Sequence, residues 1–185
     1  MNLANKLTLL RVILVPVFLI FLIGKGIPYG SIIATLIFII ASLTDQLDGY
    51  IARSRNQITN FGKFMDPLAD KLLVTAALIS LVELHLIPSW AAVIIIAREF
   101  AVSGLRTVAA SEGTVIAASW WGKIKTVTQI IAILLLLLQV NIESIKALNS
   151  SFEASAFLNN FFAYAPKIAL FIAVAMTIIS GIDYF

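Results

Sequence analysis

The sequence predicts an all-α integral membrane protein with six transmembrane helices and a short N-terminal interfacial helix. Of its 185 residues, 61% are hydrophobic and 12% are charged, whereas soluble domains contain about 25% charged residues. The mean hydropathy is +1.01. A helix needs about 20 apolar residues to cross a bilayer. The segments that approach this length are residues 7–24, 30–52, 61–84, 88–110, 117–140 and 159–182.

The first span follows the segment "MNLANKLTLL", which has one lysine before an apolar stretch. No small-residue cleavage site follows "FLIFLIGKG", so we expect an uncleaved first span preceded by the interfacial helix. The connections are short, apart from a longer predicted outer loop, "NIESIKALNSSFEAS". Without linkers, repeats or low-complexity tracts, residues 1–185 are predicted to form a single membrane domain. The chain has no cysteine, which excludes disulfides and thiolate metal sites.

The basic residues predict the orientation of the chain in the bilayer. Ten of the thirteen fall toward one side of the six-span arrangement, and Lys25, Lys146 and Lys167 fall toward the other. By the positive-inside rule the first side is cytoplasmic, and an even number of spans places both termini there. The net charge of +3 therefore reflects membrane topology, and we expect no nucleic-acid partner.

Four of the ten acidic residues lie in one stretch, "TDQLDGYIARSRNQITNFGKFMDPLAD". Asp45 and Asp48 are three residues apart on the second predicted span, and Asp66 and Asp70 are four apart on the third. Each pair therefore shares a helix face. An antiparallel helix pair with a short connection can aim both faces at each other near the cytoplasmic surface. A charge at the bilayer centre costs at least about 2.5 kcal/mol, so these carboxylates must face a wet or ion-paired interior.

Four carboxylates at close quarters repel, so they either take up protons or bind a positive group. Hard divalent cations prefer oxygen ligands, and two of them about 3.5 to 4 Å apart would form a clamp for in-line phosphoryl chemistry. The alternative is a membrane-surface salt-bridge network with Arg53, Lys63 and Lys71. The spacing of all four acids, with small residues between them, favours the metal site.

The same stretch contains a recognisable pattern. It reads DxxDGxxAR from Asp45 to Arg53 and, after eight further residues, GxxxDxxxD from Gly62 to Asp70. This resembles the signature of the CDP-alcohol phosphotransferase family, and all eight fixed positions are filled. Members of that family move a phosphatidyl or related group from a CDP-linked donor to an alcohol and release CMP.

The resemblance implies a role for each matching residue. The four aspartates would hold two divalent cations, Mg²⁺ or alternatively Mn²⁺, on the pyrophosphate of the donor. Asp70 would also be the catalytic base that deprotonates the acceptor hydroxyl. The small residues leave room for the cytidine, although small residues also serve helix packing, and the arginine supports the nucleotide and phosphate site. The residues assigned to the donor are Gly49, Ala52, Arg53 and Gly62.

The acceptor is suggested by basic residues further along the chain. Arg98 and Arg106 are eight residues apart, or about 80° around one helix, so both can point into one cavity. Lys123 and Lys125 are two apart and point in different directions, so we expect only one of them to line that cavity. Lys125 has a topology anchor as its alternative role. Guanidinium groups bind phosphate through paired hydrogen bonds. The two arginines, together with the two lysines, therefore favour an acceptor that carries a phosphate.

These segments, with "NLANKLTLLRV" and "NFGKFMDPLADKLL", resemble bacterial family members that use CDP-diacylglycerol and sn-glycerol 3-phosphate. The resemblance implies a homodimer in the bilayer of the bacterial plasma membrane, with its active site facing the cytoplasm. Asn5, Thr8 and Arg11 are candidates for the mouth of the site, with helix capping by Asn5 and interfacial anchoring by Arg11 as alternatives.

Other functions remain as alternatives. An acceptor such as inositol phosphate or serine would keep the same donor chemistry, although an uncharged or zwitterionic acceptor leaves the basic residues unexplained. A divalent-cation transporter would spread its carboxylates along a path through the bilayer, whereas these cluster at one end. An intramembrane aspartyl protease needs two catalytic aspartates, and four at this spacing do not suit it.

Overall fold

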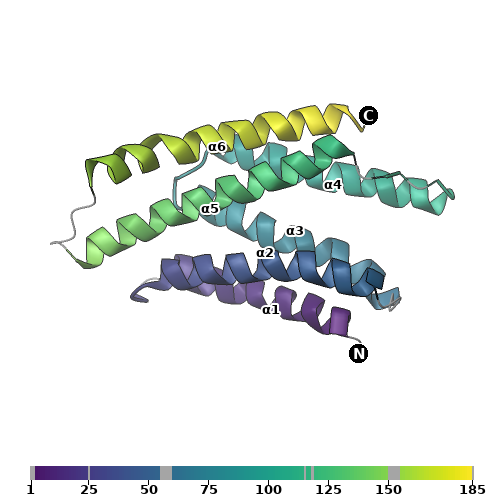
Figure 1. Ribbon diagram of the computed structural model, residues 1–185, viewed down its shortest axis with the longest axis horizontal. Coiled ribbons are helices and arrows are strands. Elements are labelled where there is room, and N and C mark those ends of the chain that lie inside the picture. The colour runs from purple at the N-terminus through teal and green to yellow at the C-terminus, as the bar shows by residue number, and fades with distance from the viewer. Residues whose placement is uncertain are drawn as a thin grey trace. The chain divides into compact units, whose positions relative to one another are not determined.

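The computed structural model describes residues 3–24, 26–54, 60–114, 116–117, 119–149 and 155–184. Side chains are described for these residues except 3–7, 45–54, 60–67, 70 and 156. All regular structure in this part of the chain is α-helical (Figure 1). The helices are α1 (Leu3–Ile23), α2 (Gly30–Ser54), α3 (Asn60–Glu83), α4 (Ser89–Ser111), α5 (Trp120–Leu148) and α6 (Ala156–Ile182). The all-α prediction is confirmed, and each predicted span corresponds to one helix.

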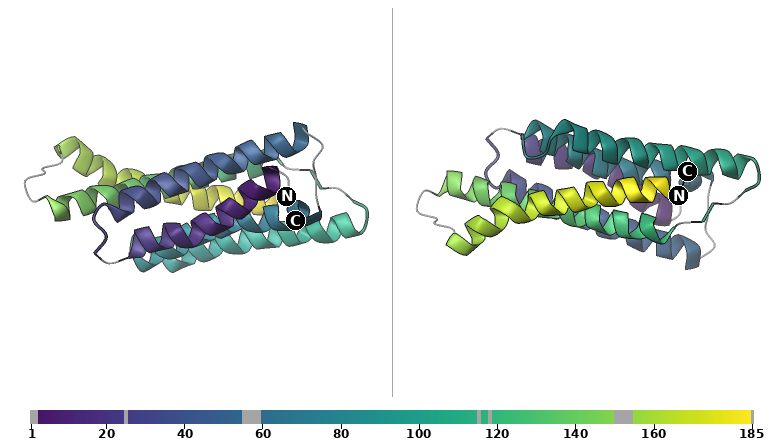
Figure 2. Two further views of the ribbon diagram at one scale, coloured as in Figure 1. Left: turned by 90° about the horizontal axis from the view of Figure 1, so that it is seen from below. Right: turned by 90° about the horizontal axis from the view of Figure 1, so that it is seen from above.

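The chain divides into two compact units, Met1–Ser80 and Leu81–Phe185, and the division falls within α3. In the first unit α1 and α2 pack side by side (Figures 1 and 2). The buried rings of Phe18 and Phe38 meet between these helices, with centroids 6.1 Å apart. Gly30 permits a close approach, because a Cβ atom there would lie 2.5 Å from the carbonyl oxygen of Phe21.

In the second unit α6 packs against both α5 and α4 (Figure 2). Each helix contributes a stripe of small and branched apolar side chains to the core, as helices do when they bury one face. The buried members are Ala91, Ala92, Ile95, Val102, Ala132, Ile133, Leu136, Leu137, Ala173 and Val174.

Two helical segments among the described residues are long and apolar enough to cross a membrane: Trp120–Leu148 and Phe157–Ile182. Two more apolar segments, Thr8–Ile23 and Gly30–Thr44, are shorter. Large apolar side chains point outward from α6, where Phe171 is 72% and Ile182 is 74% exposed. Such a surface suits contact with hydrocarbon better than contact with water, which is consistent with a membrane protein.

The N-terminal segment differs from the prediction. Helix α1 is continuous from Leu3 to Ile23, so the predicted short interfacial helix is not a separate element but forms the first turns of α1. The sequence before Pro16 contains no glycine or proline, and nothing there interrupts the backbone hydrogen bonds.

Helix α5 continues through Leu148, beyond the predicted end at residue 140, so the first part of the predicted outer loop is helical. Gln139 donates a hydrogen bond to Glu143 one turn later, at 3.0 Å. Lys146 lies in the last turn, where a positive charge is favourable, and its Nζ donates to Asn159 Oδ1 of α6 at 2.6 Å. The predicted span ended at residue 140 because the apolar segment stops there. The polar residues that follow instead continue the helix.

Candidate active site

The backbone of the aspartate motif is helical. Asp45 and Asp48 lie in α2, and Asp66 and Asp70 lie in α3. The side chains of these four residues are outside the described part of the chain, so the predicted meeting of the carboxylates stays a prediction. Among the described residues there is no group of three or more histidine, aspartate or glutamate side chains that could hold a metal ion.

The four residues predicted to bind the donor follow the same helices. Gly49, Ala52 and Arg53 lie in α2, and Gly62 lies in α3. Their side chains and the connecting residues 55–59 are also outside the described part. The backbone is helical at these positions, as predicted. Positions 45, 48 and 52 therefore follow one stripe of α2, and positions 62, 66 and 70 follow one stripe of α3.

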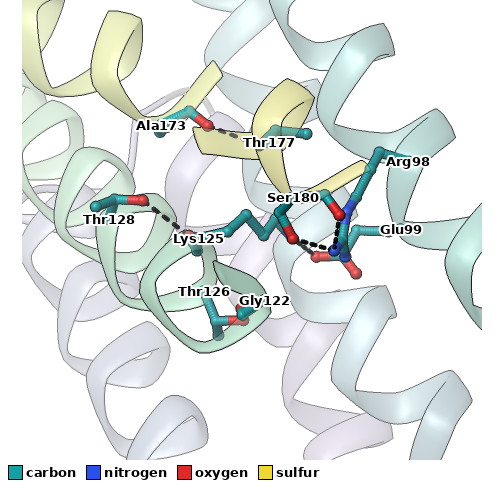
Figure 3. Close-up of polar contacts among 9 residues, drawn as sticks. All are labelled: Arg98, Glu99, Gly122, Lys125, Thr126, Thr128, Ala173, Thr177 and Ser180. Carbon is teal, nitrogen blue, oxygen red and sulfur yellow. Dashed lines mark hydrogen bonds and ion pairs between the residues drawn. The ribbon is translucent and has the colours of Figure 1, made fainter. Parts of the chain in front are cut away.

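The two arginines of α4 converge on residues at the end of α6. Arg98 donates hydrogen bonds from Nη2 to the hydroxyl and, at 3.3 Å, to the carbonyl oxygen of Ser180 (Figure 3). Arg106 donates from Nη2 to the hydroxyl of Tyr184 at 3.1 Å. The guanidinium carbons lie 5.4 Å (Arg98) and 5.3 Å (Arg106) from the centroid of the Tyr184 ring. The eight-residue spacing thus places both cations beside one aromatic ring, and the predicted shared cavity stays a prediction.

These two cations have no acidic partner among the described residues. Neither arginine forms an ion pair there, and the buried Nε of each has no hydrogen-bond partner in the described part of the chain. Two neighbouring positive charges repel, and spare N–H donors are costly when buried. The arrangement is therefore suited to an anion that accepts several hydrogen bonds.

The two lysines of α5 have different surroundings. Lys125 is 1% exposed and forms an ion pair with Glu99 of α4 (Figure 3). Lys123 is exposed, and its Nζ lies 5.7 Å from the centroid of the Trp120 ring, within the range of a cation–π contact. The expectation that the two lysines point in different directions is confirmed, and the charge of Lys125 is already balanced by an acid.

Sequence reasoning missed Glu99 as the partner of Lys125. A signal was present, because an acid inside an apolar helix needs a cationic partner. A lysine on the next helix of the chain was an available candidate.

Tyr184 was missed entirely. Its hydroxyl accepts a hydrogen bond from the Ser119 amide at 2.8 Å and lies 3.5 Å from the Ala117 carbonyl oxygen, to which it donates. Ser119 in turn caps α5, because its Oγ accepts from the Gly122 amide at 3.1 Å. Burial alone would raise the pKa of the Tyr184 phenol, but hydrogen bonding from Ser119 and the charges of the two arginines lower it below 10.0.

The residues suggested for the mouth of the site lie on α1. Thr8 and Arg11 are each 1% exposed, so Arg11 does not extend from the surface as an interfacial anchor would. The side chain of Asn5 is outside the described part. A buried arginine needs compensating polar partners, which makes Arg11 a feature of the interior.

Comparison with known proteins agrees with the motif. The model of the CDP-alcohol phosphatidyltransferase family matches residues 1–179. The CDP-diacylglycerol–glycerol-3-phosphate 3-phosphatidyltransferase of Bacillus subtilis is 48% identical over 195 residues, covering 100% of this chain and 93% of the relative. The enzyme of the same name from Haemophilus influenzae is 42% identical over 190 residues, with 99% and 91% covered. A probable phosphatidylglycerophosphate synthase of Mycobacterium tuberculosis is 40% identical over 185 residues, with 99% and 79% covered. The chain therefore belongs to the CDP-alcohol phosphatidyltransferase family.

Proposed function

We propose that this protein transfers the phosphatidyl group of CDP-diacylglycerol to sn-glycerol 3-phosphate, giving phosphatidylglycerol phosphate and CMP. The names of the relatives at 48% and 42% identity, which match nearly the full chain, support this reaction. The structural observation that carries the choice of acceptor is the arginine pair, which has no carboxylate partner among the described residues. A phosphate on the acceptor supplies the missing negative charge.

The donor side of the proposal uses the aspartate motif. Four carboxylates form an all-oxygen ligand set, which is what Mg²⁺ and Mn²⁺ prefer. The proposed ligands of two such cations are Asp45, Asp48, Asp66 and Asp70. Bound there, the cations would polarise the phosphoryl oxygens of the donor. Gly49, Ala52, Arg53 and Gly62 form the proposed donor-binding set.

The chemical step assigned to the protein is proton removal. Asp70 takes the proton from the acceptor hydroxyl as its oxygen attacks the phosphorus that carries diacylglycerol. A new phosphorus–oxygen bond forms, the pyrophosphate bond breaks, and CMP leaves with the electron pair. The reaction requires no covalent intermediate on the protein.

In the proposed acceptor site, Arg98 and Arg106 bind the phosphate of glycerol 3-phosphate. Their buried Nε donors support this role, because a phosphate can accept from Nε and Nη together. Lys123 and Lys125 contribute less: Glu99 already balances the charge of Lys125, and Lys123 is exposed beside Trp120.

We also propose that residues 1–185 form one domain with six spans in the bacterial plasma membrane. The two long apolar helices and the two shorter apolar segments support several crossings. The excess of basic residues on one side of the six-span arrangement supports an active site that faces the cytoplasm. Assembly as a homodimer is part of the proposal and is supported by the family resemblance alone.

The test uses purified protein in detergent with CDP-diacylglycerol, Mg²⁺ and a panel of acceptors, with CMP release as the readout. We expect CMP with glycerol 3-phosphate and little with glycerol, serine or inositol phosphate. CMP with inositol phosphate alone would reassign the acceptor. If no acceptor gives CMP, the enzyme assignment is wrong, and divalent-cation transport becomes the function to measure.

A further inference from the structure

Tyr184 connects three segments of the second unit. Its ring faces both guanidinium groups of α4, and its hydroxyl binds Arg106, the Ser119 amide and the Ala117 carbonyl. The residue lies after α6, outside residues 1–179 that the family model matches. The family match therefore assigns no role to it.

Two free arginine side chains would not stay close together. Each has many rotamers, whose restriction costs conformational entropy, and their like charges repel. The face of an aromatic ring attracts cations, and one ring serves both arginines here. The hydrogen bond to Arg106 fixes the second cation further. Tyr184 thus offsets the cost of holding the pair before an anion arrives.

The hydroxyl of Tyr184 is already fully engaged. It accepts from Arg106 and from the Ser119 amide, and it donates to the Ala117 carbonyl. No proton or lone pair is left for a reacting group, which argues against a direct part in proton transfer. Its contacts with Ala117 and Ser119 also fix the arginines relative to the start of α5.

We propose that Tyr184 is a positioning residue that holds Arg98 and Arg106 ready to bind the phosphate of the acceptor. The proposal rests on the proposed function, because it concerns the same acceptor site. Preorganised donors increase affinity by lowering the cost of ordering on binding. Loss of Tyr184 should therefore weaken binding of the acceptor and leave the donor and the chemical step unaffected.

The experiment compares Tyr184→Phe and Tyr184→Ala with the wild type, using CMP release. KM is measured for glycerol 3-phosphate and for CDP-diacylglycerol, together with kcat at saturation. We expect Tyr184→Phe, which keeps the ring, to raise KM for glycerol 3-phosphate about tenfold through loss of the hydroxyl contacts. Tyr184→Ala should raise it about 100-fold. KM for CDP-diacylglycerol and kcat should stay within about twofold of the wild type, as expected for a loss of acceptor binding alone.

The controls are Tyr164→Phe and Tyr164→Ala. Tyr164 is an exposed tyrosine of α6, so its substitution should leave KM for both substrates and kcat unchanged. An unchanged KM for glycerol 3-phosphate in both Tyr184 variants would overturn the inference and leave the proposed function intact. Equal losses in all three parameters would also overturn it, because they indicate general structural damage. If Tyr184→Ala does not fold, Tyr184→Phe decides the question. A wild type that releases no CMP with glycerol 3-phosphate would overturn both proposals.

Discussion

The aspartate motif and the arginine pair differ in how the chain builds them. The eight fixed positions of the motif lie within residues 45–70, on two helices that follow each other. The arginine pair depends on contacts between residues far apart in the sequence. Arg98 and Ser180 are separated by 82 positions, and Arg106 and Tyr184 by 78. The proposed donor chemistry is thus encoded locally, whereas the proposed acceptor site depends on tertiary packing. Substitutions in the two regions should have different kinetic effects.

The largest effect is expected for Asp70→Asn. The variant keeps the size of the side chain but removes a metal ligand and the proposed base, so CMP release should fall by about 10³-fold or more. Part of the donor binding should survive, since the other three aspartates remain. CMP release and CDP-diacylglycerol binding are measured side by side. Glu112→Gln, at an exposed acid after α4, is the control. Substantial activity in Asp70→Asn would remove this residue from the role of base.

The next effect concerns stability. Glu99→Gln leaves Lys125 charged and almost completely buried without its acid, which is expected to destabilise the fold by about 3 kcal/mol. Thermal unfolding in detergent should show a clear decrease in the melting temperature. The double variant Glu99→Gln with Lys125→Met should recover most of the loss, because neither position of the former ion pair then carries a charge. A Glu99→Gln protein as stable as the wild type would show that the ion pair contributes little.

A smaller and more selective effect is expected for Arg106→Gln. Loss of the proposed phosphate contact should raise KM for glycerol 3-phosphate about 100-fold. KM for CDP-diacylglycerol should not change, in contrast to substitutions in the aspartate motif. Lys167→Gln, which removes an exposed charge of α6, tests whether any loss of positive charge has the same effect. An equal change in both KM values would remove the distinction between a donor region and an acceptor region.

The smallest effect is spectroscopic. Because the pKa of Tyr184 is lowered, an absorbance titration should contain a component below the usual value of a tyrosine, and Tyr184→Phe should remove that component. A depressed pKa adds stability above the unfolded-state pKa, and this stability is lost as the pH falls through the folded-state value. The contribution is therefore confined to alkaline pH. Glycerol 3-phosphate bound to the arginines should raise the pKa, and no response would argue against phosphate binding there.

The sequence predicted the helices because long apolar segments leave few alternatives. The prediction was wrong at the polar end of α5, where Glu143 and Lys146 suggested a loop but lie in the helix. It placed Arg98 and Arg106 on one side of one helix, and the contacts with Tyr184 agree. Their partners could not be predicted, because helical spacing relates residues within one helix and gives no information about α6. The role of every predicted site residue remains a prediction.

The most direct test of the account compares glycerol 3-phosphate with glycerol as acceptors for the wild type and for Arg98→Gln with Arg106→Gln. The two acceptors differ by the phosphate that the arginine pair is proposed to bind. We predict that the wild type, with CDP-diacylglycerol and Mg²⁺, releases CMP at a much higher rate with glycerol 3-phosphate, and that the double variant loses this preference. Equal rates with both acceptors in the wild type, or an unchanged preference in the double variant, would contradict the account.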